Sequence, residues 1–420
     1  MSQPTRILLA LVIGLAFGIG AASLGWADAL VPVSRPIGHL WLNALEMTII
    51  PLVMALVVTG IAATAEAANA GRIAARAIIT FIVMLWLFSA LAAVMVPLLL
   101  KVWPLGMEAA ASLRGALAGA KPVGTVPGFG DFLAGIVPTN AIAAAANDAF
   151  LPFIVFTLVF AFALTRLPSE QRERLTDLFE ALRDAMLVMI GWILWIAPLG
   201  VFALAFTVGA QAGVAAFGAL IHYILIVSSV GVVIGLIGYP VALIGGGVPL
   251  GRFARAVAPA QAVALSTESS LASLPAMLRG AEGLGIPVGT SGVVLPIATA
   301  IFRATSPAMN LAVAIYVARW FGVPLTATSL ITGLAVAAIT TLGSVSLPGQ
   351  ISYVASIAPI ALSMGVPLAP LGLLVAVETL PDIVRTVGNV TMDLAVTAMI
   401  AKHGPQTKDD LGDALLAERE

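Results

Sequence analysis

Five polar residues near the C-terminal end of the chain have a spacing that could hold a charged ligand. They lie in a segment, roughly residues 367–400, that is otherwise apolar enough to span a bilayer: Asp382, Arg385, Thr386, Asn389 and Asp393. At 100° per residue these side chains fall within about 100° of arc, so they form one polar stripe on a helix. Each charge placed at mid-membrane opposes insertion by about 2.5–3.5 kcal/mol, so we expect the stripe to face a polar cavity and not lipid.

The stripe offers the groups that recognise an amino acid. A guanidinium is a fork of donors that can hold a carboxylate bidentately, and a carboxylate one turn away can accept an ammonium. The alternative is an ion-paired seam that only joins helices. The combination of groups favours an amino-acid site within a membrane protein.

The composition requires a polytopic membrane protein. Of 420 residues, 60% are hydrophobic and 10% are charged, whereas about a quarter are charged in soluble proteins. The net charge of −1 gives no basic excess that would point to nucleic acid. The chain has no Cys and only three scattered His residues, so we expect no metal site and no cofactor. An enzyme is also disfavoured, because Ser269 and Ser270 have no nearby His base.

Six apolar segments of spanning length precede residue 250. They lie near residues 7–27, 37–64, 77–103, 140–165, 184–210 and 215–247. The first could also be a signal peptide, but the spans that follow it favour a transmembrane helix. With alternating spans and the N-terminus inside, most Lys and Arg residues lie inside, which predicts cytoplasmic N- and C-termini in a cell membrane. Residues 403–420 would be a cytoplasmic tail.

Two polar interruptions follow Pro259. They are residues 266–275 and residues 340–350, and each lies between apolar arms too short to cross a bilayer separately. We expect each to be the tip of a re-entrant hairpin, with a kinked ordinary helix as the alternative. Irregular backbone at membrane depth is tolerated only where it is buried in protein or lines a cavity. Paired interruptions of this kind indicate a transporter site built from inverted repeats.

A second arginine lies within an apolar segment between these interruptions. Arg303 is followed by Pro307, which we expect to break the helix. A charged side chain at membrane depth needs a partner. The sequence offers Glu268 as the natural candidate.

Motifs along nearly the whole chain resemble those of the dicarboxylate/amino acid:cation symporters, a family that includes the glutamate transporters. These motifs are residues 36–51 (second helix), 195–203 (fifth helix), 266–275 (hairpin 1), 347–349 (hairpin 2) and 382–393 (eighth helix). The resemblance implies an all-α protein with eight transmembrane helices and two re-entrant hairpins, which works as a homotrimer by an elevator motion. Residues 1–250 would be mostly scaffold, with part in the transport domain, and residues 251–402 would form the transport core.

The resemblance also implies roles for individual residues. Arg385 would bind a side-chain carboxylate and Asp382 the substrate ammonium, while Asn389 and Thr386 would surround the backbone carboxylate. The pocket would be closed by the following groups: Ser270, the backbone at Glu268, Ser306, and the hairpin 2 tip of Leu347, Pro348 and Gly349. The pairing of Arg385 with Asp382 favours aspartate or glutamate over a C4-dicarboxylate, which has no ammonium to satisfy a buried Asp.

The chain departs from the family where sodium-coupled relatives place oxygen ligands. Residues 302–306 read Phe-Arg-Ala-Thr-Ser where most relatives have Asn-Met-Asp-Gly-Thr. Third-helix positions that carry Tyr, Thr and Ser in those relatives are Phe81, Met84 and Leu85 here, and Ala300 stands where a Thr is expected. We therefore expect transport that does not require sodium.

Arg303 would then act as a built-in cation, balanced by Asp393 or Glu268. Uncoupled exchange remains open, and so does proton symport with Glu268 or Asp393 carrying the proton. A sodium site built from backbone carbonyls is a further alternative. So is an anion channel with Arg303 and Arg385 along its pore.

Overall fold

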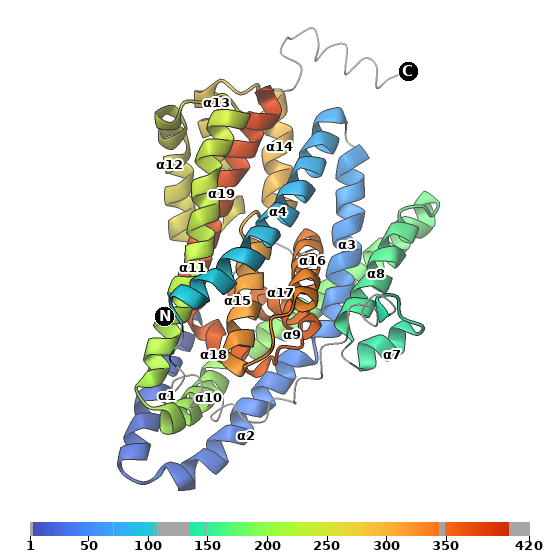
Figure 1. Ribbon diagram of the computed structural model, residues 1–420. Coiled ribbons are helices and arrows are strands. Elements are labelled where there is room, and N and C mark those ends of the chain that lie inside the picture. The colour runs from blue at the N-terminus through green and yellow to red at the C-terminus, as the bar shows by residue number, and fades with distance from the viewer. Residues whose placement is uncertain are drawn as a thin grey trace.

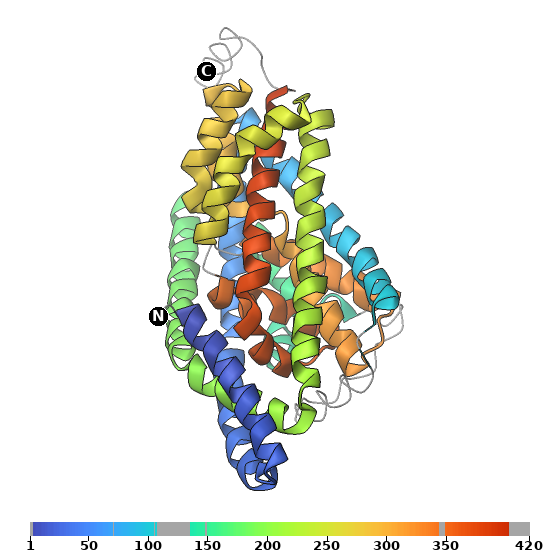
Figure 2. The same ribbon diagram turned by 90° about the vertical axis from the view of Figure 1, so that its left-hand side faces the viewer.

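The computed structural model describes residues 3–69, 71–104, 106, 135–147, 149–343 and 349–402, and within these ranges the protein is built from helices without a strand. Most of the long helices run along the longer dimension of the molecule (Figures 1 and 2). Six helical segments are long and apolar enough to cross a membrane: Gln3–Ser23, Ala27–Ala68, Arg72–Val102, Ala215–Gly245, Val288–Phe321 and Thr379–Lys402. A bent pair of helices raises this number to seven. The fold is therefore that of a multi-pass membrane protein.

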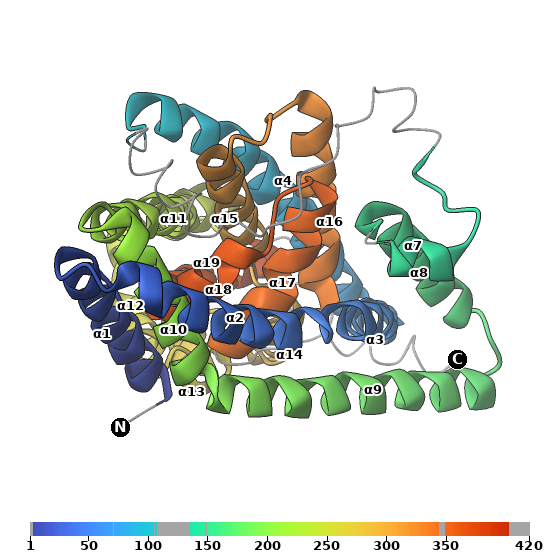
Figure 3. The same ribbon diagram turned by 90° about the horizontal axis from the view of Figure 1, so that it is seen from below.

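The described residues of the first part of the chain form the following helices: α1 (Gln3–Ser23), α2 (Ala27–Glu46), α3 (Ile49–Asn69), α4 (Arg72–Val102), α7 (Ala141–Ala146), α8 (Phe150–Leu164), α9 (Ser169–Trp195), α10 (Ala197–Ala212) and α11 (Ala215–Pro240). The apolar segment expected over residues 184–210 is bent. The chain turns by 57° between α9 and α10, at Ile196. Pro198 is the cause that the sequence offers, because it has no N–H to donate to the carbonyl of residue 194 and its ring crowds that carbonyl. Figure 3 shows α9 along one edge of the molecule.

Glycines let α1 and α10 pack backbone against backbone. A Cβ atom at Gly14 would lie 2.7 Å from the carbonyl oxygen of Phe202, and one at Gly18 would overlap the carbonyl oxygen of Phe206. Gly14 and Gly18 have the four-residue spacing that permits close helix approach within membranes. This contact fixes α1 to the break that separates α9 from α10.

The second half contains two pairs of short helices. The first pair is α12 (Leu250–Thr267) and α13 (Ser270–Leu284), and the second is α16 (Ala327–Gly343) and α17 (Gly349–Ser363). Glu268 ends α12 with a φ of 53°, and the Ser269 side chain caps α13 by accepting from the backbone N–H of Ala272 at 3.2 Å. The tip of the second pair, residues 344–348, lies outside the described residues. The first expected interruption is thus a turn between two helices.

Two further segments are broken. After α14 (Val288–Ile301) the chain is non-helical until α15 (Ser306–Phe321), so the break expected near Pro307 is confirmed at residues 302–305. The apolar segment over residues 367–400 is not one helix, because α18 (Ala369–Leu374) and a short 3-10 turn (Val375–Val377) precede α19 (Thr379–Lys402).

Two separate clusters of buried apolar side chains hold the molecule together. The larger cluster joins α1 to α4 with α8 to α11 and the α16–α17 pair. The smaller one joins α12, α13 and the second half of α19, through residues such as Phe253, Met277 and Leu394. These helices meet at one end of the molecule (Figures 1 and 2).

Candidate functional site

Arg385 lies buried between two carboxylates. Its Nη2 atom is 2.7 Å from Oε1 of Glu378, and its Nη1 atom donates to Oδ1 of Asp382 at 3.1 Å. All three side chains are almost fully buried. The Nε atom of Arg385 is buried and has no hydrogen-bond partner among the described residues. The guanidinium is therefore held in one orientation with a donor still available.

Glu378 is a site residue that the sequence analysis missed. It precedes Asp382 by four residues and Arg385 by seven, which places it on the same helix face as the stripe. That spacing could have identified Glu378 as a site residue from the sequence alone. Tyr223 of α11 and Tyr353 of α17 lie within electrostatic range of Glu378, and their hydroxyls are 3.0 Å apart. Glu378 is thus surrounded by α11, α17 and the start of α19.

Asn389 is held by Thr305 from the break between α14 and α15. Its Oδ1 atom accepts from the backbone N–H of Thr305 at 2.9 Å and from the Thr305 hydroxyl at 2.8 Å. The same hydroxyl lies 2.9 Å from the backbone carbonyl of Arg385, so its single proton is shared between this carbonyl and Oδ1 of Asn389. Because a backbone N–H can only donate, Oδ1 must face Thr305, and the Nδ2 donors remain for a carboxylate. Thr305 therefore positions the Asn389 amide.

Gly388 makes room for Thr305. A Cβ atom at Gly388 would lie 2.6 Å from Cγ2 of Thr305 and 3.2 Å from the carbonyl oxygen of Gly231. Such distances are too short for ordinary packing. The break at residues 302–305 thus approaches α19 this closely only because position 388 has no side chain.

Two further residues of the expected site are buried without hydrogen-bond partners in the described part of the chain. The Asp393 side chain has 0% exposure, and neither of its oxygens has a partner; the same holds for Oγ of buried Ser306. Thr386, in contrast, donates its hydroxyl to the backbone carbonyl of Asp382 at 2.9 Å. Asp393 and Ser306 therefore join Arg385 among the expected residues with unused polar atoms.

The tip of the α12–α13 pair lies near the start of α19. Glu268 and Ser270 are half-buried, and Glu268 is within electrostatic range of Asp382. Leu347 and Pro348 lie outside the described residues, and Gly349 begins α17. The structure therefore brings one of the two expected tips toward the stripe and leaves the other undescribed.

Arg303 lies in the break between α14 and α15, within electrostatic range of Asp382 and Arg385. The residue before it, Phe302, stacks on Phe81 of α4 with ring centroids 4.4 Å apart. These two rings occupy positions at which the sequence comparison with sodium-coupled relatives expected oxygen ligands. Both rings are buried.

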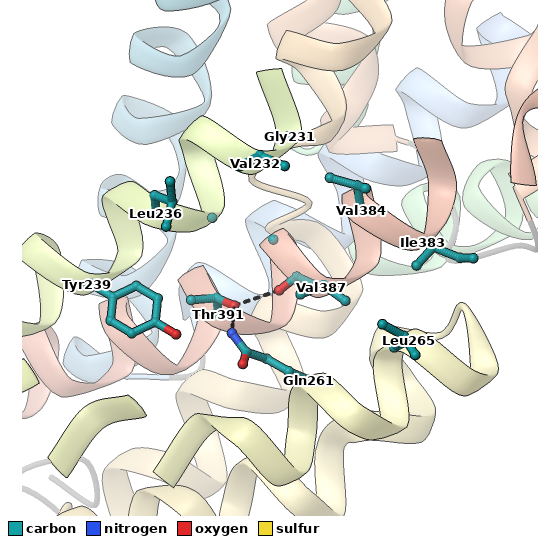
Figure 4. Close-up of a pocket in the computed structure, with 12 residues that line it drawn as sticks. Gly231, Val232, Leu236, Tyr239, Gln261, Leu265, Ile383, Val384, Val387 and Thr391 are labelled. Atoms are coloured by element: carbon teal, nitrogen blue, oxygen red, sulfur yellow. Dashed lines mark hydrogen bonds between the residues drawn. The ribbon is translucent and has the colours of Figure 1, made fainter. Parts of the chain in front are cut away.

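A groove of about 280 Å³ lies on the opposite face of α19, between α11 and α12 (Figure 4). Its polar contact is a hydrogen bond from Nε2 of Gln261 to Oγ1 of Thr391 at 2.8 Å, and Thr391 in turn donates to the Val387 carbonyl. No charged side chain lines it. The groove therefore lacks the groups that would bind an acidic ligand, whereas the Arg385 side of the helix has them.

Comparison with known proteins adds an independent finding. Residues 4–403 match the model of the sodium:dicarboxylate symporter family. The chain is 28% identical to the proton/glutamate-aspartate symporter of Escherichia coli (strain K12), over 99% of this chain and 95% of that protein. It is also similar to two C4-dicarboxylate transport proteins of Ralstonia nicotianae, protein 3 at 28% and protein 2 at 30% identity, each over 94% of this chain and 88% of the relative.

Proposed function

Because the chain belongs to the sodium:dicarboxylate symporter family, we propose that it is a secondary transporter of aspartate and glutamate. The family is one of transporters and not of enzymes, and the resemblance found in the sequence motifs is confirmed. The observation that carries the proposal is the buried Arg385, held between Glu378 and Asp382 with Nε unpartnered. Such a guanidinium can take the substrate's side-chain carboxylate.

The charges around the site support an amino acid over a C4-dicarboxylate. Arg303 and Arg385 are positive, whereas Asp382 and Glu378 carry the opposite formal charges. A dianion such as succinate would therefore add two negative charges to a site without a positive excess. Aspartate and glutamate carry an ammonium that offsets one of their carboxylates, and Asp382 is the group that would accept it.

The remaining residues supply the rest of the substrate contacts. Asn389, oriented by Thr305, would donate through Nδ2 to the substrate's backbone carboxylate. Ser306, whose hydroxyl is buried without a partner in the described structure, and Ser270 at the hairpin tip would add hydrogen bonds. The backbone at Glu268 and the segment Leu347, Pro348 and Gly349 would close the pocket.

We propose that transport does not require sodium. The stacked rings of Phe81 and Phe302 support this, because an apolar stack offers no oxygen ligand to a hard cation. The positive charge of Arg303 adds electrostatic repulsion against a bound sodium ion. We predict that Asp393 or Glu268 balances the charge of Arg303.

Proton symport is the form of coupling that we favour, with Asp393 as the carrier. A fully buried carboxylate without a hydrogen-bond partner is costly in its charged form, and a proton removes that cost. The Escherichia coli relative is named as a proton symporter. Uncoupled exchange is the second candidate, and the fixed charge of Arg303 is the observation that favours it.

The proposed architecture follows the family expectation: eight transmembrane helices, two re-entrant hairpins, a homotrimer and an elevator motion. Residues 251–402 would move as the transport core, in which a small apolar cluster joins α12 and α13 to α19. Residues 1–250 would supply mostly scaffold. Both termini and the tail of residues 403–420 would be cytoplasmic, in the inner membrane if the source is a Gram-negative bacterium.

Uptake by proteoliposomes tests the function directly. Labelled aspartate should accumulate, and unlabelled aspartate and glutamate should compete more strongly than succinate. A current without competable amino-acid uptake would instead identify an anion channel with Arg303 and Arg385 along its pore. Stronger competition by succinate would assign the protein to C4-dicarboxylates.

A further inference from the structure

Three arginines line a cavity at the base of the α12–α13 hairpin, away from the Arg385 site. Arg252 and Arg255 lie in the first two turns of α12, and Arg279 lies in the second half of α13. The two helices run in opposite directions, so the three side chains meet at the same end of the hairpin. The cavity has a volume of about 690 Å³, and its other lining residues are small: Ala256, Pro259, Ala276, Gly280 and Gly283.

The backbone uses only one donor atom from each guanidinium. The bonds are Arg252 Nη2 to the Gly283 carbonyl (3.2 Å), Arg255 Nε to the Gly251 carbonyl (3.1 Å) and Arg279 Nε to the Pro275 carbonyl (3.4 Å). A guanidinium has five N–H donors, so most donors of the three arginines remain available. The backbone bonds restrict the side chains to this cavity.

The positive charge of the cavity is not neutralised by the described part of the protein. None of its lining residues is acidic, and no carboxylate of the described residues forms an ion pair with these arginines. Glu282, the acidic residue near them in α13, does not line the cavity. Three like charges around one space repel each other, and an anion bound between them relieves this repulsion.

The shape of the cavity matches a phospholipid better than a soluble anion. The arginines lie at the base of the hairpin, and the apolar residues Pro259 and Ala276 lie further along the two helices toward its tip. Beyond these, Leu271 near the tip is 60% exposed. A soluble phosphate would use only the guanidiniums, whereas a phospholipid also needs an apolar wall next to its phosphate.

We propose that this cavity binds the phosphate headgroup of an anionic phospholipid. Basic pockets between helices at a membrane surface are a known form of lipid headgroup site. Arginine suits this role because its planar fork binds phosphate oxygens bidentately. The proposal does not depend on the transported substrate, because no residue of the Arg385 site lines the cavity.

Native mass spectrometry of the purified full-length protein in detergent tests the proposal. The probes are dioleoyl phosphatidylglycerol and dioleoyl phosphatidylcholine, titrated separately. The variant combines Arg252→Gln, Arg255→Gln and Arg279→Gln, and a matched control combines Arg172→Gln, Arg174→Gln and Arg183→Gln in α9. Wild type and control should bind phosphatidylglycerol roughly tenfold more tightly than phosphatidylcholine, and the cavity variant should lose this preference.

Several outcomes would overturn the proposal. One is an equal preference for phosphatidylglycerol in the cavity variant and the control. Another is displacement of the lipid by inorganic phosphate at the lipid's own concentration, which would indicate a soluble-anion site. The absence of any preference in wild type would also overturn it. If the triple variant does not fold, Arg279→Gln is compared with Arg279→Lys. Lysine keeps the positive charge without the fork, so Arg279→Lys should retain more of the preference than Arg279→Gln, and an equal loss would overturn the proposal.

Discussion

Phe81 of α4 and Phe302 of the break between α14 and α15 stack nearly parallel, with ring centroids 4.4 Å apart and an interplanar angle of 10°. The two residues are far apart in the sequence but both are buried. Their contact joins the third long span to the segment that carries Arg303 and Thr305. The two rings occupy positions at which the resemblance to sodium-coupled relatives predicts oxygen ligands.

The first prediction follows from this stack. Aspartate uptake into proteoliposomes should be unchanged when sodium is replaced by choline on both sides, because neither ring can coordinate a cation. Uptake should be measured at matched pH, so that a proton gradient does not contribute. Strict dependence on sodium would show that backbone carbonyls alone form a sodium site.

The second prediction concerns Arg385. Arg385→Ala should abolish binding of aspartate and glutamate, because it removes the carboxylate partner and leaves Glu378 and Asp382 buried without a positive charge. Loss of a buried charged partner typically costs about 3–5 kcal/mol, or roughly two to three decades of affinity. Isothermal titration of the purified protein measures this, with Arg174→Ala as the control. Unchanged affinity in Arg385→Ala would refute the assignment.

Thr305 should act on substrate through Asn389. Thr305→Val keeps the branched shape but removes the hydroxyl, and a neutral hydrogen bond contributes about 0.5–1.5 kcal/mol, so the affinity for aspartate should fall about 2- to 10-fold. Thr305→Ser keeps the hydroxyl and should bind as wild type does. If the Ser and Val variants lose affinity equally, the hydroxyl does not position the amide.

Gly388 and Thr305 should show coupled effects on stability. Gly388→Ala places a methyl group against Cγ2 of Thr305, and overpacking of this kind costs about 1–3 kcal/mol. Thr305→Ser removes Cγ2, so the double variant should recover part of that loss, although the contact with Gly231 remains. Thermal unfolding in detergent measures all four proteins. Strictly additive effects would mean that the two side chains do not compete for the same space.

Asp393 should control the response to a proton gradient. Asp393→Asn keeps the shape but cannot release a proton, so an inward proton gradient should no longer stimulate aspartate uptake. Exchange of external for internal aspartate should persist, because it needs no net proton movement. Glu268→Gln is the matched comparison. If the proton gradient still stimulates uptake by Asp393→Asn but not by Glu268→Gln, the proton carrier is Glu268 at the hairpin tip. If the gradient does not stimulate uptake by the wild type, transport is uncoupled exchange.

Helix periodicity explains which parts of the site could be predicted. The residues from Asp382 to Asp393 lie on one helix, and their relative positions follow from the 3.6-residue repeat alone. The interruption near residue 268 and the break before Pro307 also carried local signals, because Ser, Gly and Pro disfavour continuous helices within membranes. These features could therefore be predicted without knowledge of the tertiary structure.

The remaining features depend on contacts between distant segments or on breaks that we did not anticipate. The bond from Thr305 to Asn389 and the stack of Phe81 on Phe302 have no local pattern, because helix packing alone decides which residues meet. Glu378 was missed for another reason. It lies one turn before Asp382, where the chain changes from a 3-10 turn to α19, and the predicted stripe began only at Asp382.

The left-handed conformation of Glu268 affects how this protein could be stabilised. A residue with a side chain in this conformation is strained by about 1–2 kcal/mol relative to glycine. Glu268→Gly should therefore appear as a beneficial change in any thermostability screen, even though it removes the carboxylate from the hairpin tip. If the Glu268 carboxylate balances the charge of Arg303, a screen that scores transport would reject the same change. Selection for heat resistance and selection for turnover would then drive this position in opposite directions.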